Sequence, residues 1–117
     1  MIRTSVLFVV LVFVCAACGS SPAPSPTPGP AANVTVTIVG SAGSQSFSPN
    51  PATVPPGQTV AWHNVDTVTH HVVLNDGALD TGDIAPGAFS APMILRAVGP
   101  YHCSIHPSMV GTIVSGQ

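Results

Sequence analysis

The feature that most constrains the fold is a series of short runs of alternating β-forming residues, separated by turn residues, from residue 33 onward. Val34, Val36 and Ile38 alternate with threonines, which predicts a strand with one buried face. The chain has neither Lys nor Glu and is rich in Val, Thr, Pro and Gly, so long helices are disfavoured. In a chain of 117 residues, the pattern predicts one all-β domain, a Greek-key β-sandwich of about seven to eight strands.

The expected strands follow from the β-forming residues and from the turn chemistry between them. They cover residues 34–38, 47, 52–54, 60–62, 70–74, 89–97, 101–103 and 109–114. Strand alternation places Trp62 in the core and His63 on the surface. It also places Tyr101 and Cys103 on one face of their strand and His102 on the other.

The N-terminal region has the pattern of an export signal over residues 1–17. Arg3 precedes an apolar run over 6–14 that is too short to span a membrane as a helix. The sequence that follows, Ala-Ala-Cys18, resembles the lipobox of bacterial lipoproteins, and this resemblance implies that Cys18 is acylated. A plain secreted protein and an uncleaved anchor are the alternatives.

The remaining chain divides into a Pro/Ser-rich segment over residues 18–32 and a domain over residues 33–117. The first segment has nothing to bury and predicts an extended tether. From the signal, the lipobox-like motif and this tether, we expect the domain in the periplasm or on the extracytoplasmic face of a bacterial membrane. A lipid anchor is then its only expected contact with the membrane.

Charge is scarce in this chain, which has two basic and four acidic residues and a formal net charge of −2. It therefore lacks the basic patch that nucleic-acid binding requires. The acidic residues are Asp66, Asp76, Asp80 and Asp83. No pair of them has a spacing that suggests acid–base catalysis, so we assign them to turns and to solubility.

Cys103 is the cysteine that remains in the domain once Cys18 is modified, so it has no disulfide partner in an oxidising compartment. It stands in the segment YHCSIHPSM, where Cys103, His106 and Met109 have the spacing C-x-x-H-x-x-M. Two histidines, one cysteine and a weak axial methionine define a blue-copper electron-transfer site. Structural zinc is the alternative, but zinc gains little from a thioether.

The second histidine of such a site has to come from elsewhere in the chain. The candidates are His63, His70, His71 and His102. In the strand 70–74, His70 should share the inward face with Val72 and Leu74. Alternation therefore favours His70, with His71 as the alternative.

The domain as a whole resembles the cupredoxins, specifically the plastocyanin-like group that includes amicyanin and pseudoazurin. The resemblance rests on VPPGQTVAWHN (54–64), HHVV (70–73) and the segment 99–113, whose short gap between His106 and Met109 is similar to that of amicyanin. His71 departs from the family, which has Asn at this position, and Thr69 replaces a common proline. The resemblance implies one copper per chain, held by His70, Cys103, His106 and Met109.

The same resemblance implies an exported, monomeric one-electron carrier with a mononuclear blue (type 1) copper site, which exchanges electrons with other redox proteins. We expect their contact surface to be an apolar patch around His106. Its expected members are Val68, Pro86, Ile105, Pro107 and Met109. Copper delivery or storage is the alternative function. Catalysis of the nitrite reductase or multicopper oxidase kind would need further histidine-rich copper centres, so we do not expect an enzyme.

Overall fold

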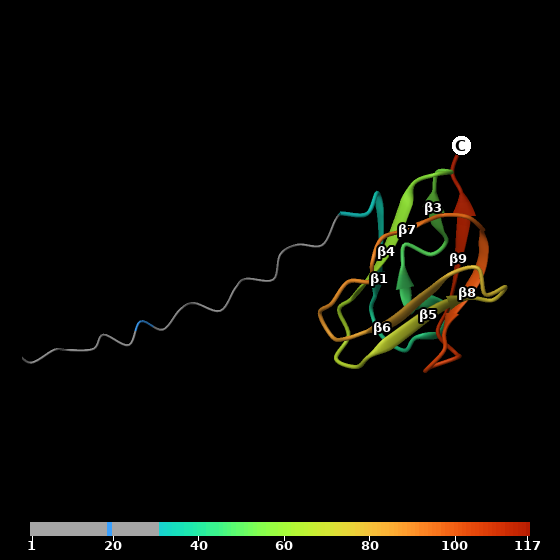
Figure 1. Cartoon of the computed structure of the whole chain (residues 1–117). Coiled ribbons are helices and arrows are strands. Elements are labelled where there is room, and N and C mark those ends of the chain that lie inside the picture. Colours follow the sequence, from blue (N-terminus) through green and yellow to red (C-terminus); the bar gives the residue numbers. More distant parts are fainter. Residues whose placement is uncertain (1–18, 20–30) are drawn as a thin grey trace, which may run out of the picture.

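The computed structural model describes residue 19 and residues 31–117. The predicted signal peptide, Cys18 and most of the predicted tether lie outside these residues. The described part folds into nine strands in two sheets that lie face to face, with one short 3-10 turn, η1 (Gly43–Gln45) (Figure 1). It contains no helix that is both long enough and apolar enough to cross a membrane. The predicted all-β sandwich is confirmed, with slightly more strands than expected.

Each sheet combines strands that are distant in sequence. Sheet A consists, in spatial order, of β2 (Phe47–Ser48), β1 (Val34–Ile38), β4 (Thr59–Asn64) and β7 (Met93–Ile94). Sheet B consists of β3 (Ala52–Val54), β9 (Val110–Ser115), β8 (Gly99–Cys103), β5 (His70–Leu74) and β6 (Asp80–Ile84). The centre of sheet A is the parallel pair β1 and β4. The central strand of sheet B is β8, which is antiparallel to both β5 and β9.

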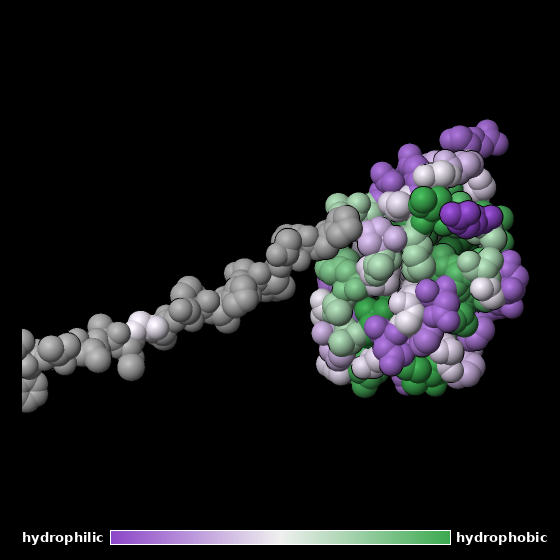
Figure 2. Space-filling view, in the orientation of Figure 1, coloured by the Kyte–Doolittle hydropathy of each residue, from purple (hydrophilic) through white to green (hydrophobic). Residues whose placement is uncertain are grey.

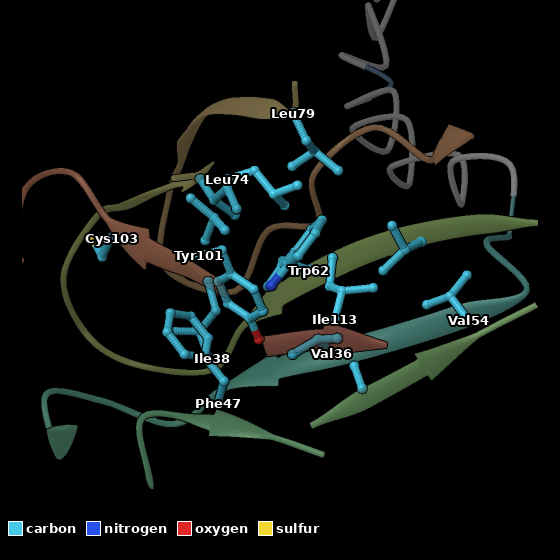
Figure 3. Packing of buried hydrophobic residues seen from close by; sticks show 14 of the residues in the cluster. Val36, Ile38, Phe47, Val54, Trp62, Leu74, Leu79, Tyr101, Cys103 and Ile113 are labelled. Atoms are coloured by element: carbon cyan, nitrogen blue, oxygen red, sulfur yellow. The ribbon is translucent and has the colours of Figure 1, made fainter. Parts of the chain in front are cut away.

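The core lies between the two sheets and follows the alternation seen in the sequence. In β1 the two alternate residues Val36 and Ile38 are buried. An aromatic group fills the centre, where the Tyr101 ring lies edge-on to Phe47 at 4.8 Å and to Trp62 at 5.5 Å between ring centroids. Figure 3 shows Cys103 at one end of this core. The fold therefore carries the cysteine at the margin of a tightly packed interior.

One expected strand, 89–97, is shortened to β7, Met93–Ile94. The reason lies in Ser90. It contacts Trp62 of β4 with one side-chain and one backbone hydrogen bond, instead of the two backbone hydrogen bonds of a regular strand pair. Its hydroxyl accepts the Trp62 N–H at 2.9 Å, and its own N–H donates to the Trp62 carbonyl at 2.8 Å. Pro92 follows, and it has no N–H to offer a neighbouring strand.

A strand that was not expected, β6, is built from Asp-Thr-Gly-Asp-Ile, most of which are poor β-forming residues. Pairing with β5 compensates for this composition. The Thr81 hydroxyl accepts the Val72 N–H at 2.9 Å, and the side chains of Asp80 and Asp83 hydrogen-bond to His71. Side-chain contacts to the neighbouring strand therefore stabilise β6.

The two ends of the sandwich differ in what they carry. β1 and β4 are parallel, with Val34 opposite Val60 at one end and Ile38 opposite Asn64 at the other. The loop after Asn64 leads directly to His70, while the β8–β9 loop begins after Cys103. The described chain thus enters the fold at the end opposite the β4–β5 and β8–β9 loops (Figure 1).

Candidate metal centre

Three side chains with metal-binding donors meet at the end of the sandwich where β5 begins and β8 ends. His70, Cys103 and His106 each offer one donor atom, and these atoms all lie within 4.8 Å of one another. The Cys103 Sγ is 3.6 Å from the His70 Nδ1 and 3.7 Å from the His106 Nδ1. The centroids of the His70 and His106 rings are 5.1 Å apart, and the two ring planes are inclined at 61° to each other. The structure therefore brings together three of the four predicted ligands.

Strand geometry places His70 in this cluster. In β5 the residues His70, Val72 and Leu74 are buried, while His71 and Val73 between them are half-buried. In β8, Tyr101 and Cys103 are buried and His102 between them is half-buried. Both donors thus point between the sheets because they share a phase with core residues.

The β8–β9 loop supplies His106, which is half-buried, and Met109, which is fully buried. Backbone hydrogen bonds close the loop: the Met109 N–H donates to the His106 carbonyl at 2.9 Å, and the Cys103 N–H donates to the Met109 carbonyl at 3.0 Å. These bonds hold Cys103, His106 and Met109 in one compact unit. The role of Met109 as an axial ligand stays a prediction.

Asp66 contacts the cluster from the loop between β4 and β5. Its Oδ2 accepts a hydrogen bond from the His70 Nε2 at 2.9 Å. This hydrogen bond, together with one from the Thr67 N–H, lowers the pKa of Asp66. The assignment of Asp66 to turn formation and solubility alone was therefore wrong. Sequence reasoning missed this contact because it depends on the conformation of the loop over residues 65–69.

His71 lies on the opposite face of β5, between two carboxylates. Its Nε2 is 2.5 Å from the Asp80 Oδ1, and its Nδ1 is 3.0 Å from the Asp83 Oδ1. The hydrogen bond to Asp80, and then the one to Asp83, raise the pKa of His71. These two aspartates also do more than the turn and solubility roles that we expected. Carboxylates accept at both ring nitrogens, so His71 has no free nitrogen for a metal.

The backbone of His71 does reach the cluster. Its N–H donates to the Cys103 Sγ at 3.5 Å, and its carbonyl accepts the Ser104 N–H at 2.8 Å. A hydrogen bond to sulfur stabilises the thiolate form of a cysteine. His71 therefore acts on the site through its main chain, while its side chain contacts β6.

The other two histidine candidates lie away from the cluster. The His63 ring stacks on the exposed Phe89 ring, with centroids 3.9 Å apart and planes at 3°. The His102 Nδ1 lies 2.6 Å from the Asn75 Oδ1. Both point away from the core, as strand alternation predicts.

The donor set fits copper. A buried thiolate and two imidazoles are the strong ligands of a blue-copper site, and a thioether is its weak axial ligand. The Cys103 side chain is fully buried and forms no disulfide with any residue that the structure describes, so its sulfur remains available for a metal. Within the part of the chain that the structure describes, this is the one cluster of three such residues.

Comparisons with solved structures agree with the fold. No protein-family model and no curated protein sequence matches the chain. A novel purple cupredoxin from Nitrosopumilus maritimus superimposes with a TM-score of 0.58 at 26% identity, over 72% of this chain and all (100%) of that one. An oxidised variant of amicyanin gives a TM-score of 0.54 at 25% identity, over 78% and 95% of the two chains.

A third solved structure, the copper-containing nitrite reductase NirK from Thermus scotoductus SA-01, gives a TM-score of 0.58 at 28% identity. The match covers 84% of this chain but only 24% of the reductase. The fold and the His-Cys-His cluster together define a cupredoxin-type domain. The donors of this cluster suit one copper ion.

Proposed function

We propose that the protein is an exported one-electron carrier that binds copper through His70, Cys103, His106 and Met109. The observation that carries the proposal is the buried triad in which the Cys103 Sγ lies 3.6 and 3.7 Å from two imidazole nitrogens. When bound, copper supplies a one-electron couple. A small monomeric domain with such a centre can accept an electron from one protein and pass it to another.

The chain prepares this site in three ways. The sandwich places His70 and Cys103 on adjacent, hydrogen-bonded strands, so their separation varies little. The hydrogen bonds of the β8–β9 loop keep His106 and Met109 near them. Burial of Cys103 excludes water from the sulfur. A preorganised site needs little rearrangement when its charge changes, which favours fast electron transfer.

Copper delivery is less well supported, because two of the three clustered donors are fully buried and a delivery site must release its metal readily. Catalysis is also less well supported. The nitrite reductase is about four times as long as the region that resembles this chain. The described residues carry no second cluster of three metal-binding residues that could act as a catalytic centre.

We propose the β8–β9 loop as the place where redox partners dock. His106 is half-buried there, next to Ile105, which is 47% exposed, and to the exposed Pro107. Val68 and Pro86 in other loops are also exposed. Figure 2 shows hydrophobic surface at this end of the molecule, interrupted by hydrophilic residues. Met109 does not belong to this surface, contrary to expectation, because it is fully buried.

We further propose export and lipid anchoring through Cys18, supported by the signal-like sequence 1–17 and the lipobox-like Ala-Ala-Cys18. β1 enters the fold at the end opposite the β8–β9 loop, so an anchor on the N-terminal side leaves that loop accessible (Figure 1). Cys18→Ala should move the protein from the detergent phase to the aqueous phase in a detergent extraction. Wild-type protein in the aqueous phase would refute the anchor.

The experiment that tests the carrier function is a redox titration of the copper-loaded protein, followed by visible absorption. We expect an intense band that disappears on addition of one electron per copper and returns fully on reoxidation. Cys103→Ser should abolish the band, because the charge-transfer transition needs a thiolate ligand. Ser104→Ala, which leaves the donors intact, should keep it. Retention of the band in Cys103→Ser would overturn the site.

A further inference from the structure

We infer that Asp66 is a positioning residue of the copper site: its carboxylate sets the tautomer of His70, directs the free Nδ1 toward Cys103 and strengthens His70 as a donor. The inference rests on the proposed function, and it concerns a residue outside the predicted ligand set. It goes further because it assigns to this chain a specific means of adjusting its copper affinity and potential.

The tautomer follows from the chemistry of the contact. A carboxylate can only accept, so the hydrogen between the Asp66 Oδ2 and the His70 Nε2, 2.9 Å apart, belongs to the ring. A neutral imidazole carries one N–H, and its other nitrogen then has a free lone pair. In His70 that nitrogen is Nδ1, the atom 3.6 Å from the Cys103 Sγ. Asp66 thus presents the unprotonated nitrogen to the metal.

Asp66 is itself held in place by its loop. Its N–H donates to the Asn64 Oδ1 at 3.0 Å, and its Oδ1 accepts the Thr67 N–H at 2.7 Å. Asn64 is fully buried, and its amide donates to the carbonyls of Val68 at 2.7 Å and Ile84 at 2.9 Å. Asn64 therefore joins the start and end of this loop to β6, which leaves the Asp66 carboxylate little freedom to move.

The negative charge of Asp66 acts on His70 without a competing basic group nearby in the described part of the chain. Among the described residues, His70 is the single basic group within ion-pair distance of this carboxylate. His70 is fully buried and Asp66 is 22% exposed, so the interaction is only partly screened by water. The arrangement is the outer part of a carboxylate–histidine–metal series, in which the carboxylate orients the ring and increases electron donation from its other nitrogen.

An imidazole that donates more strongly stabilises the more highly charged state of a metal. Asp66 should therefore increase the affinity for Cu(II) more than the affinity for Cu(I), and so lower the midpoint potential. Removal of a hydrogen-bond partner of a metal-ligating histidine typically costs about 10–100-fold in metal affinity. If the affinity for Cu(II) alone falls tenfold, the potential of a one-electron couple rises by about 59 mV.

The test compares Asp66→Asn and Asp66→Ala with Asp76→Asn. Asp66 accepts from His70 with Oδ2 and from Thr67 with Oδ1. Asparagine keeps only one acceptor oxygen, so Asp66→Asn removes the charge and one of these two acceptors at nearly constant volume. Asp76→Asn makes the same charge change in a turn where the carboxylate accepts the Ala78 N–H. The measurements are Cu(II) affinity, midpoint potential and, in metal-free protein, the ¹⁵N NMR tautomer of His70.

We expect about tenfold weaker Cu(II) binding and a higher potential in Asp66→Asn, and a larger change of both in Asp66→Ala. Asp76→Asn should resemble wild type. Metal-free wild type should carry the His70 proton on Nε2, a result that needs neither copper nor a variant. A proton on Nδ1, or equal affinities and potentials in Asp66→Asn and Asp76→Asn, would overturn the inference. A wild type that binds copper without a thiolate band would instead overturn the proposed function.

Discussion

Two neighbouring histidines in β5, the candidate ligand His70 and His71, differ in the face of the sheet that they occupy and in the carboxylates that they contact. His70 is fully buried, whereas the side chain of His71 is 26% exposed. His70 has one carboxylate partner and keeps a free nitrogen, which faces Cys103. His71 has two carboxylate partners and keeps none. The residue type is the same, so the face of the strand and the number of carboxylates distinguish the two roles.

The difference has a simple origin in strand geometry. Successive residues of a strand point to opposite faces of the sheet, so one step along β5 exchanges the interior for the outer surface. On the inner face, His70 lies with Val72 and Leu74 at the margin of the core. On the outer face, His71 meets the side chains of β6. The His71 backbone, which belongs to neither face, still donates its N–H to the Cys103 Sγ.

The largest effect is expected when each of the two histidines is removed in turn, which tests which of them binds copper. His70→Gly should abolish the thiolate absorption and weaken Cu(II) binding by more than about a hundredfold, beyond the usual effect of an outer partner. His71→Gly should keep the band, because no metal donor is lost. Absorption spectra and copper titrations of the two variants check this. A band that survives in His70→Gly but not in His71→Gly would reverse the assignment.

Substitutions on the inner face of a strand should also cost more folding stability than substitutions on its outer face. Two neighbouring residues of β9 test this. A Cβ added at Gly111 would lie 2.4 Å from the Tyr101 ring, which is itself fixed in the core. Gly111→Ala should therefore reduce the free energy of unfolding by about 3 kcal/mol, the cost of overpacking a core. Thr112→Ala, on the outer face, should change it by about 0.5 kcal/mol or less. Denaturant unfolding of the metal-free variants measures both, and similar values would contradict the packing.

The β8–β9 loop around His106 and the acidic face formed by Asp76, Asp80 and Asp83 are alternative docking surfaces. Electron self-exchange between protein molecules distinguishes them. Ile105→Asp places a charge in the apolar surface and should slow self-exchange about tenfold, equivalent to about 1.4 kcal/mol. Asp83→Asn should leave the rate nearly unchanged, and salt should have little effect on wild type. NMR line broadening measures these rates. A steep salt dependence with a normal Ile105→Asp rate would favour the acidic face.

The smallest expected effect is a pH dependence of stability that comes from His71. Its pKa is raised in the folded protein from an ordinary value of 6.5. The stabilisation is therefore complete below about pH 6.5 and is lost as the pH rises through the folded pKa. Metal-free wild type should lose stability over that range relative to His71→Gln. Parallel curves for the two proteins would show that the carboxylates do not stabilise the charged ring.

Local patterns in the sequence predict a large part of this site. The spacing C-x-x-H-x-x-M identified Cys103, His106 and Met109, and strand alternation predicted that His70 points inward. Both patterns act over a few residues, where backbone geometry alone determines which side chains are neighbours. For the same reason the two-sheet, all-β fold could be predicted.

What could not be predicted depends on contacts between segments. Asp66 meets His70 because a buried Asn64 shapes the intervening loop, and no periodicity indicates this. β6 forms through pairing and side-chain contacts that its composition does not suggest. Met109 was expected at the surface with its loop, but its side chain turns into the core.

The central claim is that copper is bound by the inward-facing His70 together with Cys103 and His106. X-ray absorption at the copper edge of the loaded, oxidised protein tests it most directly. We predict one short copper–sulfur distance and two copper–imidazole nitrogen distances, with the sulfur lost in Cys103→Ser and unchanged in His71→Gly. A copper shell of nitrogen and oxygen alone in the wild-type protein would contradict the account.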